Sequence, residues 1–143
     1  MFFSKVTAEF KPHKAGLRKV LGDLESDIME TIWDKGTVSV REVYEQLRLH
    51  REIAYTTVMT IMGRLADKQL LNRETQGNAY IYSPALSKAE FSQRIVSDVL
   101  DGLLEDFAEP AMSHLLDRLS AEDEQKIERL EAIIKARRAQ GGK

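Results

Sequence analysis

Hydroxyl side chains and an arginine recur along one side of a helix predicted between residues 54 and 65. At about 100° per residue, the apolar residues of this segment share one face: Val58, Ile61, Met62 and Leu65. The opposite face carries small and polar residues: Thr56, Thr60, Gly63 and Arg64, with Thr57 at its margin. Hydroxyls reach phosphates and base edges, glycine permits close approach, and arginine binds guanine or phosphate. This set of residues therefore predicts a helix that contacts nucleic acid.

Two alternating segments follow this helix and predict a pair of β-strands, Leu70–Thr75 and Ala79–Ser83. Tyr80 and Tyr82 share one face of the second strand, where we expect them to pack against the domain. A recognition helix followed by a two-stranded wing is the arrangement of a winged helix-turn-helix. Positive charge lies on this helix and wing at three residues: Arg64, Lys68 and Arg73.

Two helices are predicted before the recognition helix. The first has an apolar face, Asp23 as its N-cap and Gly36 as its stop. The second starts with a capping box formed by Ser39 and Glu42. The recognition helix has Ala54 at its N-cap, and alanine has no side-chain acceptor. Its first amides are therefore left for water or for a DNA phosphate.

Three narrow apolar stripes follow Pro84 and predict helices that need a packing partner. A capping box at Ser87 opens the first helix, Pro110 interrupts it and opens a short one, and Ser120 caps the last. No globular segment of the sequence offers a packing surface, so we expect a second copy of the chain to supply it. The predicted dimerisation residues are Phe91, Ile95, Val99, Leu103, Phe107, Leu115, Leu130 and Ile134.

Composition argues against several classes of function. The chain has no cysteine, which removes thiolate metal sites and disulfides, and His13, His50 and His114 lack metal-ligand spacing. No nucleophile–base pair, metal cluster or phosphate loop indicates an enzyme, and no cofactor is expected. No apolar run reaches the roughly 20 residues of a membrane span, so we expect a cytoplasmic protein.

Charge is distributed unevenly along the 143 residues. The net charge is −2, but residues 1–19 carry +4, whereas residues 20–84 and 85–143 carry −3 each. We predict a basic N-terminal arm at 1–19 that is mobile unless bound, and a winged helix-turn-helix domain at 20–84. A helical dimerisation region follows at 85–138, with a tail at 139–143. The predicted fold class is mostly α with a small β-wing.

Several motifs of the chain resemble the BlaI/MecI/CopY family of bacterial repressors. They cover roughly residues 20–138 and are Leu21–Glu25, Ile28–Met29, Ile32–Trp33, Val38, Val43–Tyr44, Ala54–Leu65 and Tyr80–Pro84. The resemblance implies a homodimer that blocks transcription from a dyad-symmetric operator, often built from TACA/TGTA half-sites. Carried over to this sequence, Thr56, Thr57 and Thr60 read or buttress the major groove, and Arg64 holds phosphate.

The sequence departs from that family pattern in several places. The wing reads Gly77-Asn78-Ala79 where Gly-Arg-Ala is common, and Gln69 replaces the usual glycine after the recognition helix. The cysteine cluster of the copper branch is absent. Residues 112–116 contain no Asn-Phe bond like the cleavage site of the antibiotic branch, and the basic extension before Leu21 is longer than usual.

These observations predict a homodimeric, non-enzymatic repressor that binds double-stranded DNA and blocks transcription sterically. The predicted DNA-binding residues are Tyr55, Thr56, Thr57, Thr60, Arg64, Lys68, Arg73 and Asn78. An inducer or a protease is a further class of partner that the sequence does not identify. Two alternatives stay open: a ligand-sensing winged-helix regulator with a pocket between domain and dimer helices, and a winged-helix protein-interaction module without DNA binding.

Overall fold

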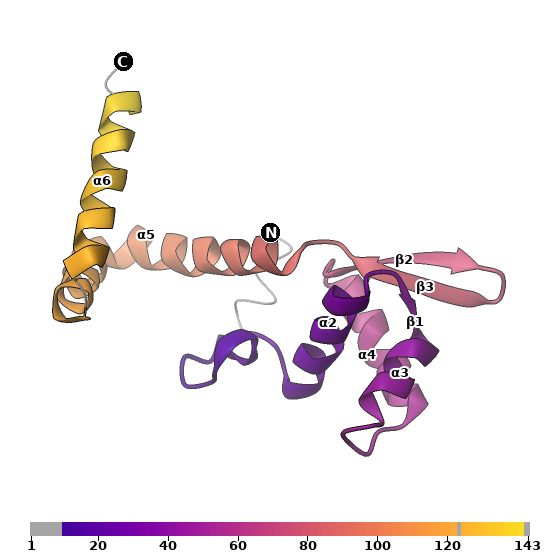
Figure 1. The fold of residues 1–143 in the computed structure, drawn as a ribbon. Helices are drawn as coiled ribbons and strands as arrows, with labels where there is room; N and C mark the ends of the chain where they lie inside the picture. The colour runs from indigo at the N-terminus through magenta and orange to yellow at the C-terminus, as the bar shows by residue number, and fades with distance from the viewer. Residues whose placement is uncertain (1–9, 123, 142–143) are drawn as a thin grey trace. The chain divides into compact units, whose positions relative to one another are not determined.

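The computed structural model describes residues 10–122 and 124–141, and the chain divides into two compact units after Val99. The elements are η1 (Gly16–Lys19), α2 (Asp23–Lys35), β1 (Val38–Ser39), α3 (Val40–Leu47), α4 (Tyr55–Asp67), β2 (Leu71–Gln76), β3 (Ala79–Pro84), α5 (Lys88–Glu122) and α6 (Glu124–Gly141) (Figure 1). Unit 1 holds the elements up to the first turns of α5, and unit 2 holds the rest. The predicted fold class, mostly α with a small β-wing, is confirmed.

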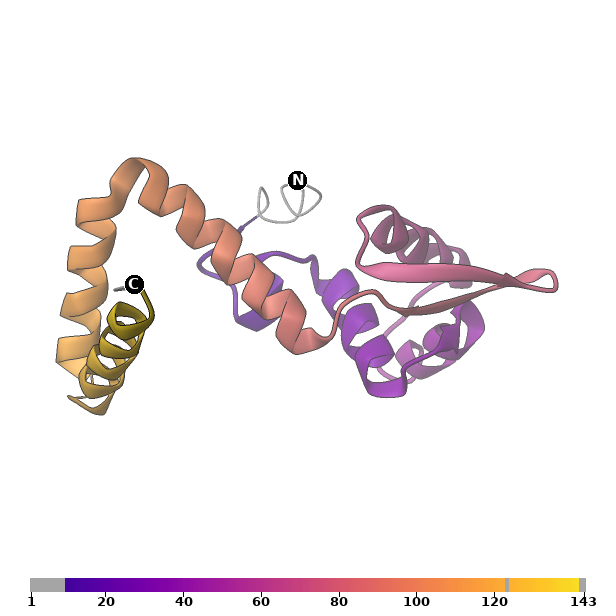
Figure 2. The same ribbon diagram turned by 90° about the horizontal axis from the view of Figure 1, so that it is seen from above.

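A three-stranded antiparallel sheet forms the wing of unit 1, in the order β1-β3-β2. Strands β2 and β3 confirm the predicted pair, with ends that differ by one residue at most, whereas the short β1 was not predicted. Gly77 and Asn78 connect β2 to β3. Gly77 has a φ of 64°, as the first central residue of a type II′ hairpin turn requires. The β2–β3 hairpin extends beyond helices α2, α3 and α4 in both views (Figures 1 and 2).

One hydrophobic core holds unit 1 together. The predicted inner face of α4 is confirmed, since Val58, Met62 and Leu65 are buried and Ile61 packs half-buried against the core. Tyr82 of β3 is buried with them. The other core residues are Val20, Leu21, Ile28, Met29, Ile32, Val38, Val40, Val43, Leu47, Leu70, Leu71 and Phe91.

Both predicted capping boxes are confirmed. The hydroxyl of Ser39 accepts from the Glu42 amide, and the Glu42 carboxylate accepts from the Ser39 amide, each at 3.1 Å. Ser87 and Glu90 make the same reciprocal pair at the start of α5, each bond at 3.0 Å. These local bonds satisfy amides that a helix start would otherwise leave without a partner.

The start of α2 lies one residue earlier than predicted. Gly22, not Asp23, is the N-cap, and its amide donates to the Glu25 carboxylate at 3.0 Å. Gly36 ends the helix as predicted, with a φ of 87° and an amide that donates to the Ile32 carbonyl at 2.7 Å.

The end of α4 forms a Schellman motif in which Gln69 takes the position usually held by glycine. The amides of Leu70 and Gln69 donate to the carbonyls of Leu65 and Ala66 at 2.9 and 3.0 Å. Gln69 has a φ of 66° and is the one non-glycine residue with a positive φ in the described part of the chain. A residue with a Cβ bears a conformational cost in this left-handed region.

The last residues of the arm predicted at 1–19 are bonded within their own segment and to α2. Lys19 Nζ donates to the Pro12 carbonyl at 2.9 Å. Arg18 forms ion pairs with Asp23 and Asp27 at 3.2 and 3.4 Å. The first nine residues of the predicted arm lie outside the described residues.

The first turns of α5 belong to the core of unit 1. Trp33 Nε1 donates to the Leu86 carbonyl at 2.9 Å, and the rings of Trp33 and Phe91 pack with centroids 5.7 Å apart. The structure therefore divides the chain after residue 99, whereas the sequence analysis ended the domain at residue 84. Phe91 is 0% exposed, so its assignment to the dimerisation stripe is wrong: its own unit encloses the ring.

Unit 2 consists of the remainder of α5 and α6, and none of its described residues is buried. Helix α5 is kinked at Phe107, whose φ of −133° and ψ of 40° are not helical. The ring of Pro110 would clash with the carbonyl four residues earlier, so the break precedes the proline instead of starting at it. Ser120 lies inside α5 and does not cap α6, contrary to the prediction.

Candidate nucleic-acid interface

The polar face of α4 is exposed, as predicted. The residues of this face at the surface are Tyr55, Thr56, Thr57, Thr60 and Arg64. Thr56 and Thr60 are one helical turn apart, so their hydroxyls lie in line along the helix. Together with the guanidinium of Arg64, they offer short donors and acceptors of the kind that contact phosphates and base edges.

Met59 adds an apolar group to this face that the sequence analysis missed. Its side chain is 44% exposed, and it lies three residues after Thr56 and next to Thr60. The helical periodicity alone could have found it, because Met59 falls outside the stripe of Val58, Met62 and Leu65. An exposed apolar side chain at this place can contact the thymine methyl group in the major groove.

Helix α4 starts without a side-chain cap, as Ala54 predicts. The amides of Thr57 and Val58 donate to the Ala54 carbonyl at 3.1 and 3.3 Å. The amides of the first turn point out of the end of this 13-residue helix, where the helix dipole favours an anion.

Tyr55 is held at this helix start by side chains of α3. Its ring meets Tyr44 edge-on, with centroids 5.6 Å apart. Arg41 lies over Tyr55 and Arg48 over Tyr44, at 5.5 and 5.7 Å from the ring centroids. Both arginines also pair with Glu45, at 3.7 and 3.5 Å. Arg41 of α3 thus lies at the start of α4, and Arg48 at the C-cap of α3 lies over the ring that meets Tyr55; neither cation was among the predicted DNA-binding residues.

Lys68 is bound to α2 and does not extend the exposed basic face. Its Nζ lies 2.9 Å from a carboxylate oxygen of Glu25, and the two side chains are 23% and 17% exposed. Burial raises the pKa of Glu25, but hydrogen bonds from the Gly22 amide and from Lys68, with the charges of Lys68 and Lys11, bring it below its ordinary value of 4.5. The geometry therefore places Lys68 in a tertiary ion pair, and its predicted DNA contact stays a prediction.

The wing presents Arg73 and Asn78 at the surface. Arg73 of β2 lies over the ring of Tyr80, with its Cζ 4.8 Å from the ring centroid. Asn78 is exposed in the turn next to Gly77. Tyr82 packs into the core, as expected, whereas Tyr80 is 49% exposed.

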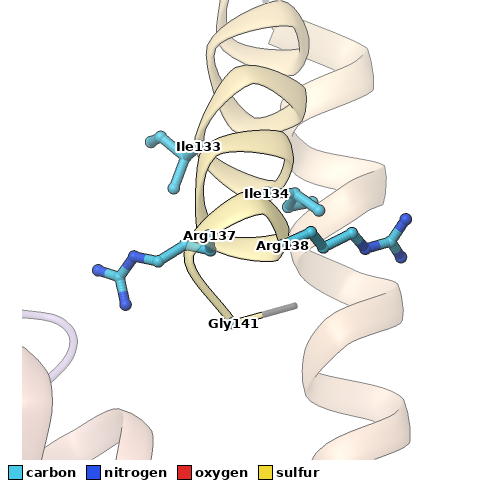
Figure 3. A pocket seen from close by; sticks show the side chains of 5 residues that line it. All are labelled: Ile133, Ile134, Arg137, Arg138 and Gly141. Atoms are coloured by element: carbon cyan, nitrogen blue, oxygen red, sulfur yellow. The ribbon is translucent and has the colours of Figure 1, made fainter. Parts of the chain in front are cut away.

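The predicted dimerisation residues are divided by the structure into three groups. Leu103, Phe107, Leu115 and Ile134 are exposed, Ile95, Val99 and Leu130 are half-buried, and Phe91 is in the core of unit 1. Near the end of α6, Ile133 and Ile134 line a shallow hollow with Arg137 and Arg138, and Figure 3 shows these two arginines pointing to opposite sides of the helix. Unit 2 thus exposes a large apolar surface in the single chain.

Among the described residues, no group of three His, Cys, Asp or Glu side chains is placed to hold a metal ion. No helix in the described ranges combines the length and apolarity needed to cross a membrane.

Comparison with known proteins identifies relatives over most of the chain. The family model of the penicillinase repressor matches residues 21–136. The transcriptional regulator BlaI of Mycobacterium tuberculosis is 34% identical over 119 residues, which cover 81% of this chain and 86% of that protein. The penicillinase repressor of Staphylococcus aureus is 28% identical over 79 residues, or 55% of this chain and 63% of that protein.

A solved structure also matches part of the chain. The monomeric form of BlaI from Bacillus licheniformis, solved in complex with the blaP half-operator, is 26% identical, with a TM-score of 0.43. The match covers 49% of this chain and 85% of that chain. The extent of the family match and the identity to the Mycobacterium tuberculosis relative carry the assignment: this chain belongs to the penicillinase repressor family.

Proposed function

We propose that this chain is a DNA-binding transcriptional repressor that acts as a homodimer on a dyad-symmetric operator. The observation that carries the proposal is the exposed face of α4, which presents Thr56, Thr60 and Arg64 on the helix that contacts β2 of the wing. Family membership supports it, because its relatives are named as a transcriptional regulator and a penicillinase repressor. A merely solubilising helix face is ordinarily rich in charged side chains rather than in threonine and glycine.

In this proposal α4 lies in the major groove with its exposed face toward the bases. Thr56, Thr57 and Thr60 read or support base edges through their hydroxyls, and Met59 contacts thymine methyl groups. Tyr55 and the first-turn amides of α4 meet the sugar–phosphate backbone, where the helix dipole favours the phosphate charge.

Two arginines supply the phosphate contacts of the proposed complex. Arg64 comes from the recognition helix and Arg73 from the wing, while Asn78 at the wing tip reaches the neighbouring groove. Lys68 is left out because Glu25 holds its charge. With a net charge of −2 over the whole chain, binding depends on these local cations rather than on the protein's total charge.

Unit 2 forms the proposed dimer contact. Its exposed large apolar residues are Leu100, Leu103, Leu104, Phe107, Met112, Leu115, Leu116, Ile133 and Ile134. Exposed apolar surface on this scale marks an interaction site. A twofold dimer places two recognition helices in successive major grooves, about 34–36 Å apart for half-sites one turn apart. The bound dimer then blocks the promoter without any catalysis.

The test is the binding of the purified full chain to DNA from upstream of its own gene. Scrambled DNA of equal length is the control, and both are measured over a series of salt concentrations. Selective binding that weakens with salt is the expected result. Equal binding to both DNAs contradicts an operator-specific repressor, and no binding at low salt favours a protein-interaction module instead.

Three variants separate the proposed roles in that assay. Thr60→Val keeps the shape of the side chain and removes its hydroxyl, so the preference for operator over mutated operator should fall. Arg64→Ala should weaken binding to all DNAs and reduce the slope of log K against log salt by about 0.9. Lys68→Met is the matched control. It removes a neighbouring positive charge that is already paired with Glu25, so it should leave the slope unchanged.

A further inference from the structure

Arg73 and the two tyrosines of the wing share one face of the hairpin. In the antiparallel register Arg73 lies opposite Tyr82, and Thr75 lies opposite Tyr80. Residues paired across an antiparallel ladder point to the same side of the sheet. The pairing therefore places Arg73, Tyr80 and Tyr82 on a common side.

The aromatic rings on this face hold the guanidinium of Arg73. Tyr82 is 1% exposed and fixes one end of the cluster in the core. The ring of Tyr80 meets it edge-on, with centroids 6.4 Å apart, and Arg73 lies 4.8 Å over the Tyr80 ring. A hydrogen bond with Tyr82 is the largest cause that raises the pKa of Arg73, and the charge of Asp67 adds to it. The arginine is thus held in place before any ligand arrives.

The same guanidinium also reaches the recognition helix at Gly63. A Cβ on Gly63 would lie 3.9 Å from Nη1 of Arg73, which is an ordinary van der Waals contact. Gly63 comes one turn after Met59 and Thr60 on α4. The arginine of the wing therefore lies beside this turn of the helix, in space that a side chain longer than alanine at residue 63 would enter.

Arg73 is also the single Lys or Arg of the wing between residues 71 and 84. The wing tip itself has the uncharged sequence Gly77-Asn78-Ala79. Any phosphate contact that the wing makes through a cation must therefore come from Arg73, at its base, and not from the tip.

We propose that Arg73 is a phosphate clamp at the junction of wing and recognition helix, with Tyr80 as the positioning residue that holds its guanidinium for the operator backbone and Gly63 leaving room for it beside α4. This inference rests on the proposed function, because it needs a DNA duplex along α4. A phosphate is the ligand that fits, since arginine binds it with two parallel hydrogen bonds, and a stacked guanidinium with five N–H donors keeps donors for them beside its bond with Tyr82. The clamp gives affinity and register rather than base specificity.

The test is a double-mutant cycle on operator binding over a salt series, using the full chain. Arg73→Ala should reduce the slope of log K against log salt by about 0.9. Tyr80→Leu removes the aromatic face and should weaken binding roughly two- to fivefold. Tyr80→Phe keeps that face and is the matched control, with binding close to that of the unchanged chain. The double variant Tyr80→Leu/Arg73→Ala should bind no more weakly than Arg73→Ala alone.

Substitutions at Gly63 give a second double-mutant cycle with Arg73, and this cycle does not depend on the stability of the wing. Gly63→Ala should be tolerated at 3.9 Å from Nη1, whereas Gly63→Leu fills the space of the guanidinium. Gly63→Leu should therefore weaken binding less in the Arg73→Ala background than in the unchanged chain. Equal weakening in both backgrounds means direct obstruction of the groove and overturns the role of Gly63.

The outcomes distinguish this inference from the proposed function. If the unchanged chain shows no preference for operator DNA, the proposed function fails and the clamp fails with it. If the unchanged chain is selective but the Arg73 and Tyr80 effects add, Tyr80 contacts DNA independently and the clamp alone is overturned. An unchanged salt slope in Arg73→Ala also overturns the clamp and leaves the repressor proposal standing.

Discussion

Replacing Gln69 with glycine should stabilise unit 1, because the end of α4 already has the backbone shape that glycine prefers. Gln69 has a φ of 66° and lies at the left-handed position of the Schellman motif, with the amides of Gln69 and Leu70 bonded to carbonyls of the last helical turn. The Gln69 side chain is exposed, so its removal costs little packing. The substitution therefore tests the backbone term almost alone.

The expected gain follows from two opposing terms. A residue with a Cβ in the left-handed region costs about 1–2 kcal/mol. Glycine also loses more chain entropy on folding than glutamine, and this opposing term destabilises the variant by about 0.4–1 kcal/mol. With the middle of each range, the net stabilisation is about 0.8 kcal/mol, which for a domain of this size corresponds to a rise in Tm of about 3–6 °C.

Thermal unfolding followed by tryptophan fluorescence suits this test. Trp33 is the single tryptophan of the chain and packs against Phe91, so its signal reports on unit 1. Gln69→Ala is the matched control: it removes the side chain but keeps a Cβ, and should give no rise in Tm. Gly77→Ala places a Cβ at a φ of 64° and should lower the Tm. A Tm for Gln69→Gly at or below that of the unchanged chain would refute the reasoning.

Three other predictions concern stability and association. The pKa of Glu25 is lowered in the folded chain, so its ion pair contributes its full stability above about pH 4.5, and this stability is lost as the pH falls through the folded pKa. Glu25→Gln should therefore lower the free energy of unfolding by about 1–2 kcal/mol at pH 7 and by less in acid, as measured by urea unfolding. Ser26 has a buried hydroxyl with no hydrogen-bond partner among the described residues, so Ser26→Ala should raise the free energy of unfolding by about 1 kcal/mol. A lower free energy of unfolding would instead indicate that the hydroxyl bonds to water. Leu103→Glu should split the proposed homodimer in sedimentation while the fluorescence of folded unit 1 persists, whereas Phe91→Glu should unfold unit 1. A dimer that survives Leu103→Glu would place the contact elsewhere.

Local signals in the sequence predicted most of unit 1. Capping boxes at Ser39 and Ser87 depend on residues three positions apart, and the inner face of α4 depends on helical spacing, so both can be read from a short window. The left-handed turn after α4 gave no such signal, because Gln69 occupies a place where glycine is usual.

Contacts between residues distant in the sequence account for what the sequence could not predict about the site. Lys68 was assigned to DNA because the sequence shows a lysine near the recognition helix, but its partner Glu25 is 43 positions away. Phe91 continues the apolar stripe of α5, but the ring of Trp33, 58 positions earlier, encloses it. The clamp geometry of Arg73 depends on Gly63 and Tyr80 from two other elements, so no local pattern could reveal it.

The absence of a buried residue among those described in unit 2 has a consequence for gene dosage. Helices that expose most of their apolar side chains gain little stability alone, so their folding is coupled to whatever covers them. In the proposed homodimer that cover is a second chain, and the dimer population near its dissociation constant rises with the square of the free chain concentration. Operator occupancy then responds more steeply than linearly to the amount of repressor. At concentrations where most chains are monomeric and most operators are free, halving its synthesis would release more than half of the bound operators.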